Sequence, residues 1–142
     1  MMTRINDKIV ITNLIPNSNR TFINDEINSF VNHRFKCTKC NCENEFNIIP
    51  YETGFGFLEI YENGKILTKE EVVTNKIATQ TSSWASYLGE LTVNDLATLY
   101  FSVECKSCKS NYLIVFSFGE KQPGLTLLEI SGVWQYRNIK AV

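Results

Sequence analysis

The fold is decided by residues 99–118, LYFSVECKSCKSNYLIVFSF. Two runs in it, 99–103 and 112–118, are rich in aliphatic and aromatic residues, which is typical of strands. Between these runs lie Cys105 and Cys108, two cysteines separated by two residues. The stretch therefore predicts a β-hairpin that carries a pair of thiols at its tip.

A second stretch repeats this arrangement earlier in the chain. Cys37 and Cys40 have the same spacing and stand between the apolar segments 33–35 and 46–49. Each pair would be the tip of a hairpin, and four thiolates are the tetrahedral ligand set that a structural Zn²⁺ prefers. The two units resemble a zinc ribbon in their cysteine pairs and flanking strands. We therefore predict one structural Zn²⁺ held by Cys37, Cys40, Cys105 and Cys108.

The separation of the two pairs departs from the usual zinc-ribbon pattern. Sixty-four residues lie between Cys40 and Cys105, against about 15–20 in the common spacing. The intervening segment is therefore expected to be part of the fold and not a simple loop. A separate disulfide within each pair is the competing interpretation, and we favour the shared metal because disulfides are rare in the cytosol.

Two further residues lie close enough in sequence to compete as ligands. Cys42 extends the first cluster to Cys-x2-Cys-x-Cys and could replace Cys40, although we expect it to be a free or partly buried thiol. His33 precedes Cys37 by four residues. Because four thiolates already complete a closed structural site, we expect His33 to be a surface residue.

The rest of the chain predicts strands and a few short helices. Strands are expected at residues 8–12 and 125–136, and Asn63-Gly64 is the signal for a type I′ hairpin turn between residues 57–62 and 65–68. An N-terminal helix is predicted from apolar residues at helical spacing, namely Phe22, Ile23, Ile27, Phe30 and Val31. Further helix signals are a capping box at Thr68-Lys69-Glu70-Glu71, residues 82–88 before Gly89, and a helix start at residues 92–95.

These patterns predict an α+β fold dominated by β-structure, in a single domain over residues 1–142. An antiparallel sheet, two zinc-knuckle hairpins and an N-terminal helix are its expected parts. The composition agrees with a globular domain, since 44% of the residues are hydrophobic and 20% are charged.

The charge balance disfavours partners that are strongly anionic. Lys and Arg number 14 and Asp and Glu number 15, so the formal charge is −1, and no global field attracts the chain to nucleic acid or to an anionic membrane. The sequence has no apolar run of signal-peptide length and none near the roughly 20 residues of a membrane span. We expect a cytoplasmic protein with reduced thiols.

Basic residues near the cysteines allow two interpretations. They could contact phosphates, as in nucleic-acid-binding ribbons, or they could offset the formal −2 charge of a zinc tetrathiolate. We favour charge balance, because acidic residues interrupt the patch. The basic residues are Arg34, Lys36, Lys39, Lys106 and Lys109, and the acidic ones are Glu43, Glu45 and Glu104.

The sequence gives little support for catalysis, and we predict no catalytic residues. Gly54-Phe55-Gly56 is too short for a nucleotide-binding loop, and no P-loop, H-E-x-x-H or G-x-S-x-G motif occurs. A catalytic zinc needs an open coordination position, which four cysteines would close. The aromatic residues are candidates either for the core or for a protein interface; they are Trp84, Tyr87, Tyr100, Trp134 and Tyr136.

The run FGEKQPG at residues 118–124, followed by ISGVW at 130–134, resembles segments of small bacterial proteins, some of which are immunity proteins of polymorphic or contact-dependent toxin systems. The resemblance covers about the last third of the chain. It implies a cytosolic protein that binds and neutralises one cognate toxin. Our first hypothesis is therefore a zinc-stabilised protein-binding module, and the alternative is a zinc-ribbon protein that binds nucleic acid or acts in transcription.

Overall fold

The structure is a computed structural model that describes residues 2–139 and consists mainly of antiparallel strands. Within these residues, three short 3₁₀ helices, η1 to η3, accompany two α-helices. In chain order the elements are β1 Ile9–Leu14, β2 Arg20–Ile23, η1 Asn24–Glu26, β3 Val31–Lys36, β4 Glu43–Ile48, β5 Phe55–Gly56, α1 Leu58–Tyr61, η2 Glu62–Gly64, α2 Lys69–Thr74, β6 Thr79–Gln80, η3 Ser83–Leu88, β7 Leu91–Thr92, β8 Ala97–Glu104, β9 Asn111–Gln122 and β10 Leu125–Asn138.

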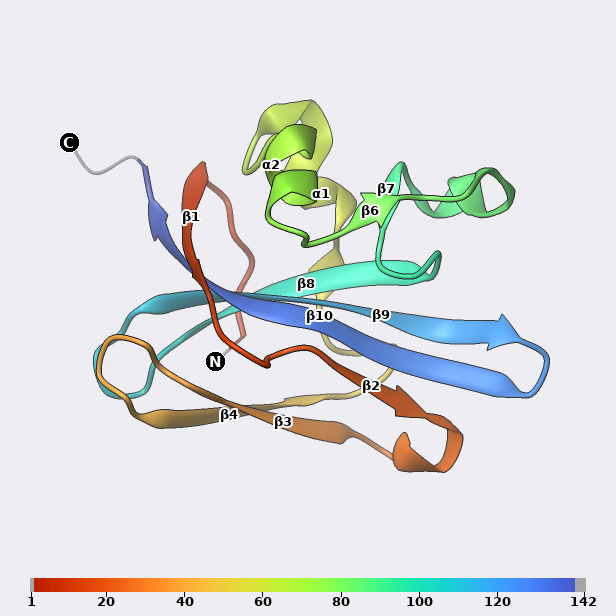
Figure 1. Ribbon diagram of the computed structural model, residues 1–142, viewed down its shortest axis with the longest axis horizontal. Helices are drawn as coiled ribbons and strands as arrows, with labels where there is room; N and C mark the ends of the chain where they lie inside the picture. The colour runs from red at the N-terminus through yellow and green to blue at the C-terminus, as the bar shows by residue number, and fades with distance from the viewer. Residues whose placement is uncertain (1, 140–142) are drawn as a thin grey trace.

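A six-stranded sheet forms the middle of the molecule, in the order β1-β10-β9-β8-β5, with β2 also paired to β10 (Figure 1). Strand β9 lies inside this sheet, and its residues 112–116 are at most 1% exposed. A continuous apolar run is what a strand needs when both of its faces are covered. The strands predicted at 99–103, 112–118 and 125–136 are confirmed as β8, β9 and β10.

Two hydrophobic cores cover the two faces of the sheet. On one face the helices α1 and α2 pack, and on the other lies the β3–β4 hairpin, as Figure 1 shows above and below the sheet. The helical core contains Ile60, Val72 and Ile77 against Tyr100, Leu113 and Trp134. The hairpin core contains Phe35, Phe46 and Ile48 against Phe101, Ile114 and Phe116.

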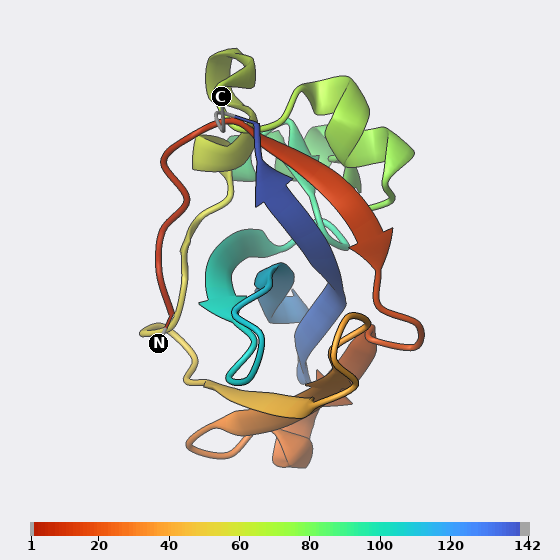
Figure 2. The same cartoon turned by 90° about the vertical axis from the view of Figure 1, so that its left-hand side faces the viewer.

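The β3–β4 hairpin forms a two-stranded sheet of its own (Figure 2). Its side chains alternate between the core and solvent, so that Phe46 is buried while Arg34 and Glu45 face outward as a cross-strand pair. In residues 2–139 no strand ladder joins this hairpin to the six-stranded sheet. Side-chain contacts and the cysteine end therefore hold it in place.

The predicted N-terminal helix is wrong. Residues Arg20–Ile23 form β2, where Phe22 lies opposite Leu128 of β10, and Val31 begins β3. Of the residues between these two strands only Asn24–Glu26 are helical, as the three-residue η1. β-Branched and aromatic residues favour strands when a partner strand is present, and β10 supplies that partner from far along the chain.

The Asn63-Gly64 turn forms, but it does not join two strands. Both residues have positive φ, 57° and 62°, and the N–H of Lys65 donates to the Glu62 carbonyl at 3.1 Å. The preceding residues form α1 because apolar side chains at helical spacing reach the core together, namely Phe57, Ile60 and Tyr61.

The helix start predicted at residues 92–95 is also wrong. Asn94 and Asp95 both have left-handed φ, 58° and 57°, and the N–H of Leu96 donates to the Val93 carbonyl at 3.3 Å. This is the backbone pattern of a type I′ turn. The chain reverses there between β7 and β8.

Two other helix predictions, those at residues 68–71 and 82–88, are confirmed. Helix α2 has the capping box: the N–H of Glu71 donates to Thr68 Oγ1 at 3.0 Å, and the N–H of Thr68 donates to Glu71 Oε1 at 2.7 Å. Residues 83–88 form η3, which ends at Gly89 with φ 121°. The helices between residues 2 and 139 all fall short of the length and apolar content that a membrane-spanning helix needs.

Thr68→Ala is expected to reduce the free energy of unfolding by about 0.5–2 kcal/mol, because it removes the side-chain acceptor at the start of α2. Urea denaturation followed by circular dichroism measures this change. Thr74→Ala is the matched control, since Thr74 is exposed near the end of the same helix and alanine has the higher helix propensity. Equal losses for both variants would contradict the capping role.

Candidate metal centre

The two cysteine pairs lie in the turns of the β3–β4 and β8–β9 hairpins, and the backbone of the two turns is alike. In each turn the N–H of the first cysteine donates to the carbonyl of the fifth residue after it. The N–H of the fourth residue after it donates to the carbonyl of that same cysteine. The fourth residue after the first cysteine is left-handed in both. The bonds are Cys37 to Cys42, Asn41 to Cys37, Cys105 to Ser110 and Lys109 to Cys105, between 2.8 and 3.0 Å.

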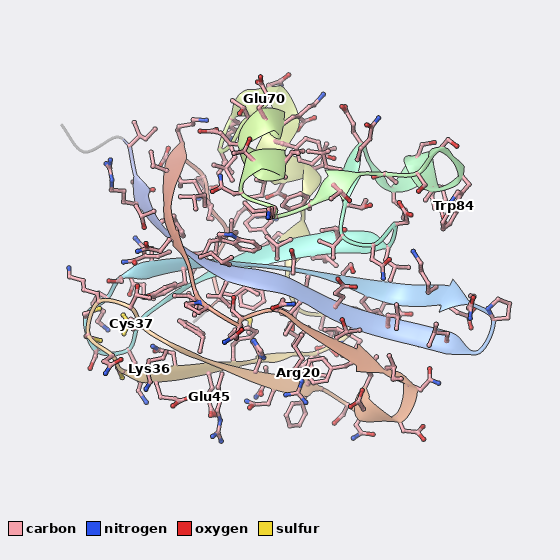
Figure 3. All side chains as sticks on the ribbon, in the orientation of Figure 1. Arg20, Lys36, Cys37, Glu45, Glu70 and Trp84 are labelled. Atoms are coloured by element: carbon pink, nitrogen blue, oxygen red, sulfur yellow. The ribbon has the colours of Figure 1, made fainter. Side chains whose placement is uncertain are left out.

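These two turns bring the four predicted ligands together at one end of the molecule (Figure 3). All four sulfur atoms lie within 4.8 Å of one another. Two close approaches cross between the hairpins, with Cys37 Sγ to Cys108 Sγ at 3.6 Å and Cys40 Sγ to Cys105 Sγ at 3.5 Å. A tetrahedral ion with metal–sulfur bonds of about 2.3 Å would set its ligands about 3.8 Å apart, so the cluster has the size of a zinc site.

Each hairpin also donates a side-chain hydrogen bond to the buried first cysteine of the other. The Tyr112 hydroxyl on β9 donates to Cys37 Sγ at 3.0 Å, and Asn44 Nδ2 on β4 donates to Cys105 Sγ at 3.4 Å. Asn44 Oδ1 in turn accepts the N–H of Lys106 at 3.0 Å. Such outer contacts orient metal ligands.

Tyr112 and Asn44 were not among the site residues predicted from the sequence. For Asn44 a signal was present, since the alternation of β4 places positions 44, 46 and 48 inward and an amide among apolar residues needs a partner. For Tyr112 the apolar run gave no such signal.

The hydrogen bonds change how readily the thiols ionise. Burial raises the pKa of the Cys105 thiol, but backbone N–H groups of its turn and the Asn44 amide outweigh this and bring the pKa to about 6. Burial also raises the pKa of Cys37, and the Tyr112 hydroxyl and nearby N–H groups lower it overall. A backbone bond lowers the pKa of Cys40, whereas burial and the other thiols raise it to about 12. These surroundings favour the thiolate, the form that binds metals, most strongly at Cys105.

Asn44→Ala is expected to weaken zinc binding about 10–100-fold, the usual effect of losing an outer contact to a ligand. Competition against a chromophoric chelator measures the affinity. Asn47→Ala is the matched control, because Asn47 lies on the same strand, faces solvent and bonds Asn32. Equal affinity for the two variants would show that the Asn44 contact does not support the site.

Cys42 and His33 lie outside the sulfur cluster. Cys42 is partly buried, and its thiol donates to the Glu43 carbonyl at 3.6 Å. His33 is only 7% exposed, so the expectation of a surface residue is wrong. Its Nε2 contacts the Ser18 carbonyl at 2.8 Å, and burial lowers its pKa. The alternation of β3 explains this, because it points Val31, His33 and Phe35 inward together.

The basic residues of the two cysteine turns are exposed. Arg34 Nε lies 3.9 Å from Glu45 Oε1, a pair across the outer face of the hairpin. Lys36 stands opposite Glu43 in the same register. The acidic residues therefore interleave with the basic ones.

The aromatic residues separate into two groups. Trp134, Tyr136 and Tyr100 are buried, at most 8% exposed, and belong to the helical core. Trp84 and Tyr87 are 64% and 82% exposed on η3. The structure thus places two of the five where a protein partner can reach them.

The run that carries the resemblance to immunity proteins forms the β9–β10 hairpin. Residues 118–122 end β9, Pro123 and Gly124 make the turn, and residues 130–134 lie within β10. Gly124 has φ 83°, a conformation that favours glycine. Compared with protein-family models, curated proteins and solved structures, the chain matches none of them.

Proposed function

We propose that the chain is a single zinc-stabilised domain in which Cys37, Cys40, Cys105 and Cys108 hold one structural Zn²⁺ as two zinc knuckles. The observation that carries this proposal is the mutual approach of four sulfur atoms to within 4.8 Å. The donor set supports zinc, since thiolates in tetrahedral geometry suit it. Bound there, the ion would tie the β3–β4 layer to the central sheet.

Metal analysis of untagged protein, purified without chelator, tests this proposal. The expected result is about one zinc per chain, as in a closed four-thiolate site. A clearly substoichiometric metal content, or disulfides within the two pairs, would contradict it.

We further propose that the protein acts by binding another protein and is not an enzyme. A closed tetrathiolate site leaves the metal no position for substrate or water. Exposed Trp84 and Tyr87 supply the residue types that anchor protein interfaces. Following the resemblance of residues 118–124 and 130–134, the role proposed is that of a cytoplasmic immunity protein that neutralises one cognate bacterial toxin.

Co-expression tests the immunity role. The immunity role requires a toxin gene directly upstream of this gene, and the toxic domain of its product is expressed in bacteria with and without the chain. The expected result is restored growth and a complex that survives nuclease treatment. Lack of protection would contradict the immunity role. Submicromolar DNA or RNA binding at physiological salt, lost on replacing Lys36, Lys39, Lys106 and Lys109 together, would instead establish the nucleic-acid alternative.

A further inference from the structure

The sulfur cluster can be reached from solvent. Of its four cysteines, Cys40 is exposed and Cys108 is partly buried, while the other two are buried. An exposed lysine adjoins each accessible cysteine in the sequence, Lys39 before Cys40 and Lys109 after Cys108. Zinc holds its cysteine ligands as thiolates, and peroxides react first with thiolates that have solvent access and electropositive surroundings. These conditions meet at Cys40 and Cys108.

Each accessible cysteine has a buried partner in the other hairpin. Cys40 Sγ lies 3.5 Å from Cys105 Sγ, and Cys108 Sγ lies 3.6 Å from Cys37 Sγ. The two contacts together use every sulfur of the cluster once. Because a disulfide is about 2.05 Å long, each contact becomes a bond when the sulfur atoms approach by about 1.5 Å.

The surroundings of the buried sulfur atoms favour bonds between the hairpins over bonds within a turn. The backbone N–H groups of the second and third residues after each buried cysteine bond its sulfur, both at Cys37 and at Cys105. These donors occupy the side of the sulfur that faces its own turn and leave the side that faces the other hairpin. Since oxidation acts on the folded domain, proximity in space and not spacing along the chain selects the partners.

We propose that the cysteine cluster is a peroxide-sensitive site, at which oxidation releases the zinc and leaves two disulfides between the hairpins, Cys37–Cys108 and Cys40–Cys105. This inference rests on the zinc site proposed above and adds its regulation.

The oxidant is hydrogen peroxide, and one molecule serves each disulfide. The accessible thiolate attacks the peroxide, becomes a sulfenic acid and releases hydroxide. The buried thiolate of the other hairpin then attacks the sulfenic sulfur, forms the S–S bond and displaces a second hydroxide. For the whole site, two peroxides take four electrons from four thiolates, and one Zn²⁺ and four hydroxides leave.

The disulfides would replace the zinc as the link between the two layers. The β3–β4 hairpin shares no strand ladder with the six-stranded sheet in residues 2–139. Disulfides between the hairpins join these layers covalently and close long loops in the unfolded chain, which stabilises a fold. Disulfides within the turns would leave the layers unlinked. The oxidised domain is therefore expected to stay folded without its metal.

Peroxide titration of the zinc-loaded protein, purified under reducing conditions, tests the inference. A chromophoric chelator measures the released zinc, and mass spectrometry of tryptic peptides identifies the disulfides after free thiols are alkylated. Trypsin separates all four cysteines, because Lys39 lies between the first two and Lys106 between the last two. The expected result is zinc release in step with two links, of peptide 37–39 to 107–109 and of peptide 40–65 to 77–106.

Cys42→Ser is the matched variant, because Cys42 lies in the same tryptic peptide as Cys40. It should give the same two links and the same zinc release. In thermal melts the oxidised protein should unfold close to the temperature of the zinc-loaded protein, and far above that of reduced protein stripped of zinc by a chelator.

The outcomes separate this inference from the proposed zinc site. Links within the two pairs, a link that disappears in Cys42→Ser, or no zinc release would overturn the inference. An oxidised protein that melts as low as the stripped protein would overturn it too. Absence of zinc from the purified protein would instead contradict the zinc site, and the peptide links formed by peroxide would still decide the pairing.

Discussion

Cys105→Ser is expected to release the metal and to lower the melting temperature far more than Cys42→Ser. Structural zinc contributes apparent binding free energy on the order of 10 kcal/mol, which becomes folding energy when the site forms only on folding. The metal also closes a long loop between Cys40 and Cys105. Cys42 lies outside the cluster, so its loss removes only a weak thiol contact.

Thermal melts with parallel metal analysis measure this difference. Cys42→Ser is the matched control, because it makes the same chemical change two residues after a proposed ligand. Equal losses of metal and of melting temperature in the two variants would show that the ligand set is wrong. Loss of metal without loss of stability in Cys105→Ser would show that the ion is not structural.

Phe46→Ala is expected to reduce the free energy of unfolding by about 3–5 kcal/mol, as for other buried aromatic residues. The centre of the Phe46 ring lies 5.3 Å from the ring centre of Phe101 in the central sheet. It lies 5.6 Å from the ring centre of His33 within its own hairpin. Because the hairpin and the sheet share no ladder in residues 2–139, this packing carries much of their attachment. Zinc affinity should fall as well, since β4 adjoins the first cysteine turn.

Chemical denaturation measures the stability change, and chelator competition measures the affinity. Phe30→Ala is the matched control, since Phe30 is 47% exposed and its truncation should cost well under half as much. A Phe46→Ala loss no larger than the Phe30→Ala loss would contradict the role of this packing.

The features predicted correctly from the sequence are those that local chemistry determines. The apolar run of β9 has the composition of a strand covered on both faces, and the capping box of α2 needs only Thr68 and Glu71. The clustering of the four cysteines follows from two short motifs on hairpins. Each of these signals lies within a few residues, and the meeting of the two cysteine pairs was predicted because one tetrahedral ion needs all four thiolates.

Most of the wrong predictions concern residues whose structure depends on distant partners, and one concerns a local turn. Phe22 has helical spacing to its neighbours but pairs with Leu128 in β10. Residues 92–95 have a helix-start composition, yet Asn94 and Asp95 make the tight turn that feeds β8. The buried contacts of Asn44 were missed for the same reason, because they exist only when the two cysteine turns meet.

The central position of β10 has a consequence for the order of events during protein synthesis. Strands β1 and β2 leave the ribosome early, yet both form their ladders with β10. Until residues 125–138 have emerged, their apolar side chains lack a partner strand. A nascent chain of this protein therefore exposes these apolar residues until β10 has been synthesised, and we expect a chain stalled before β10 to be prone to aggregation.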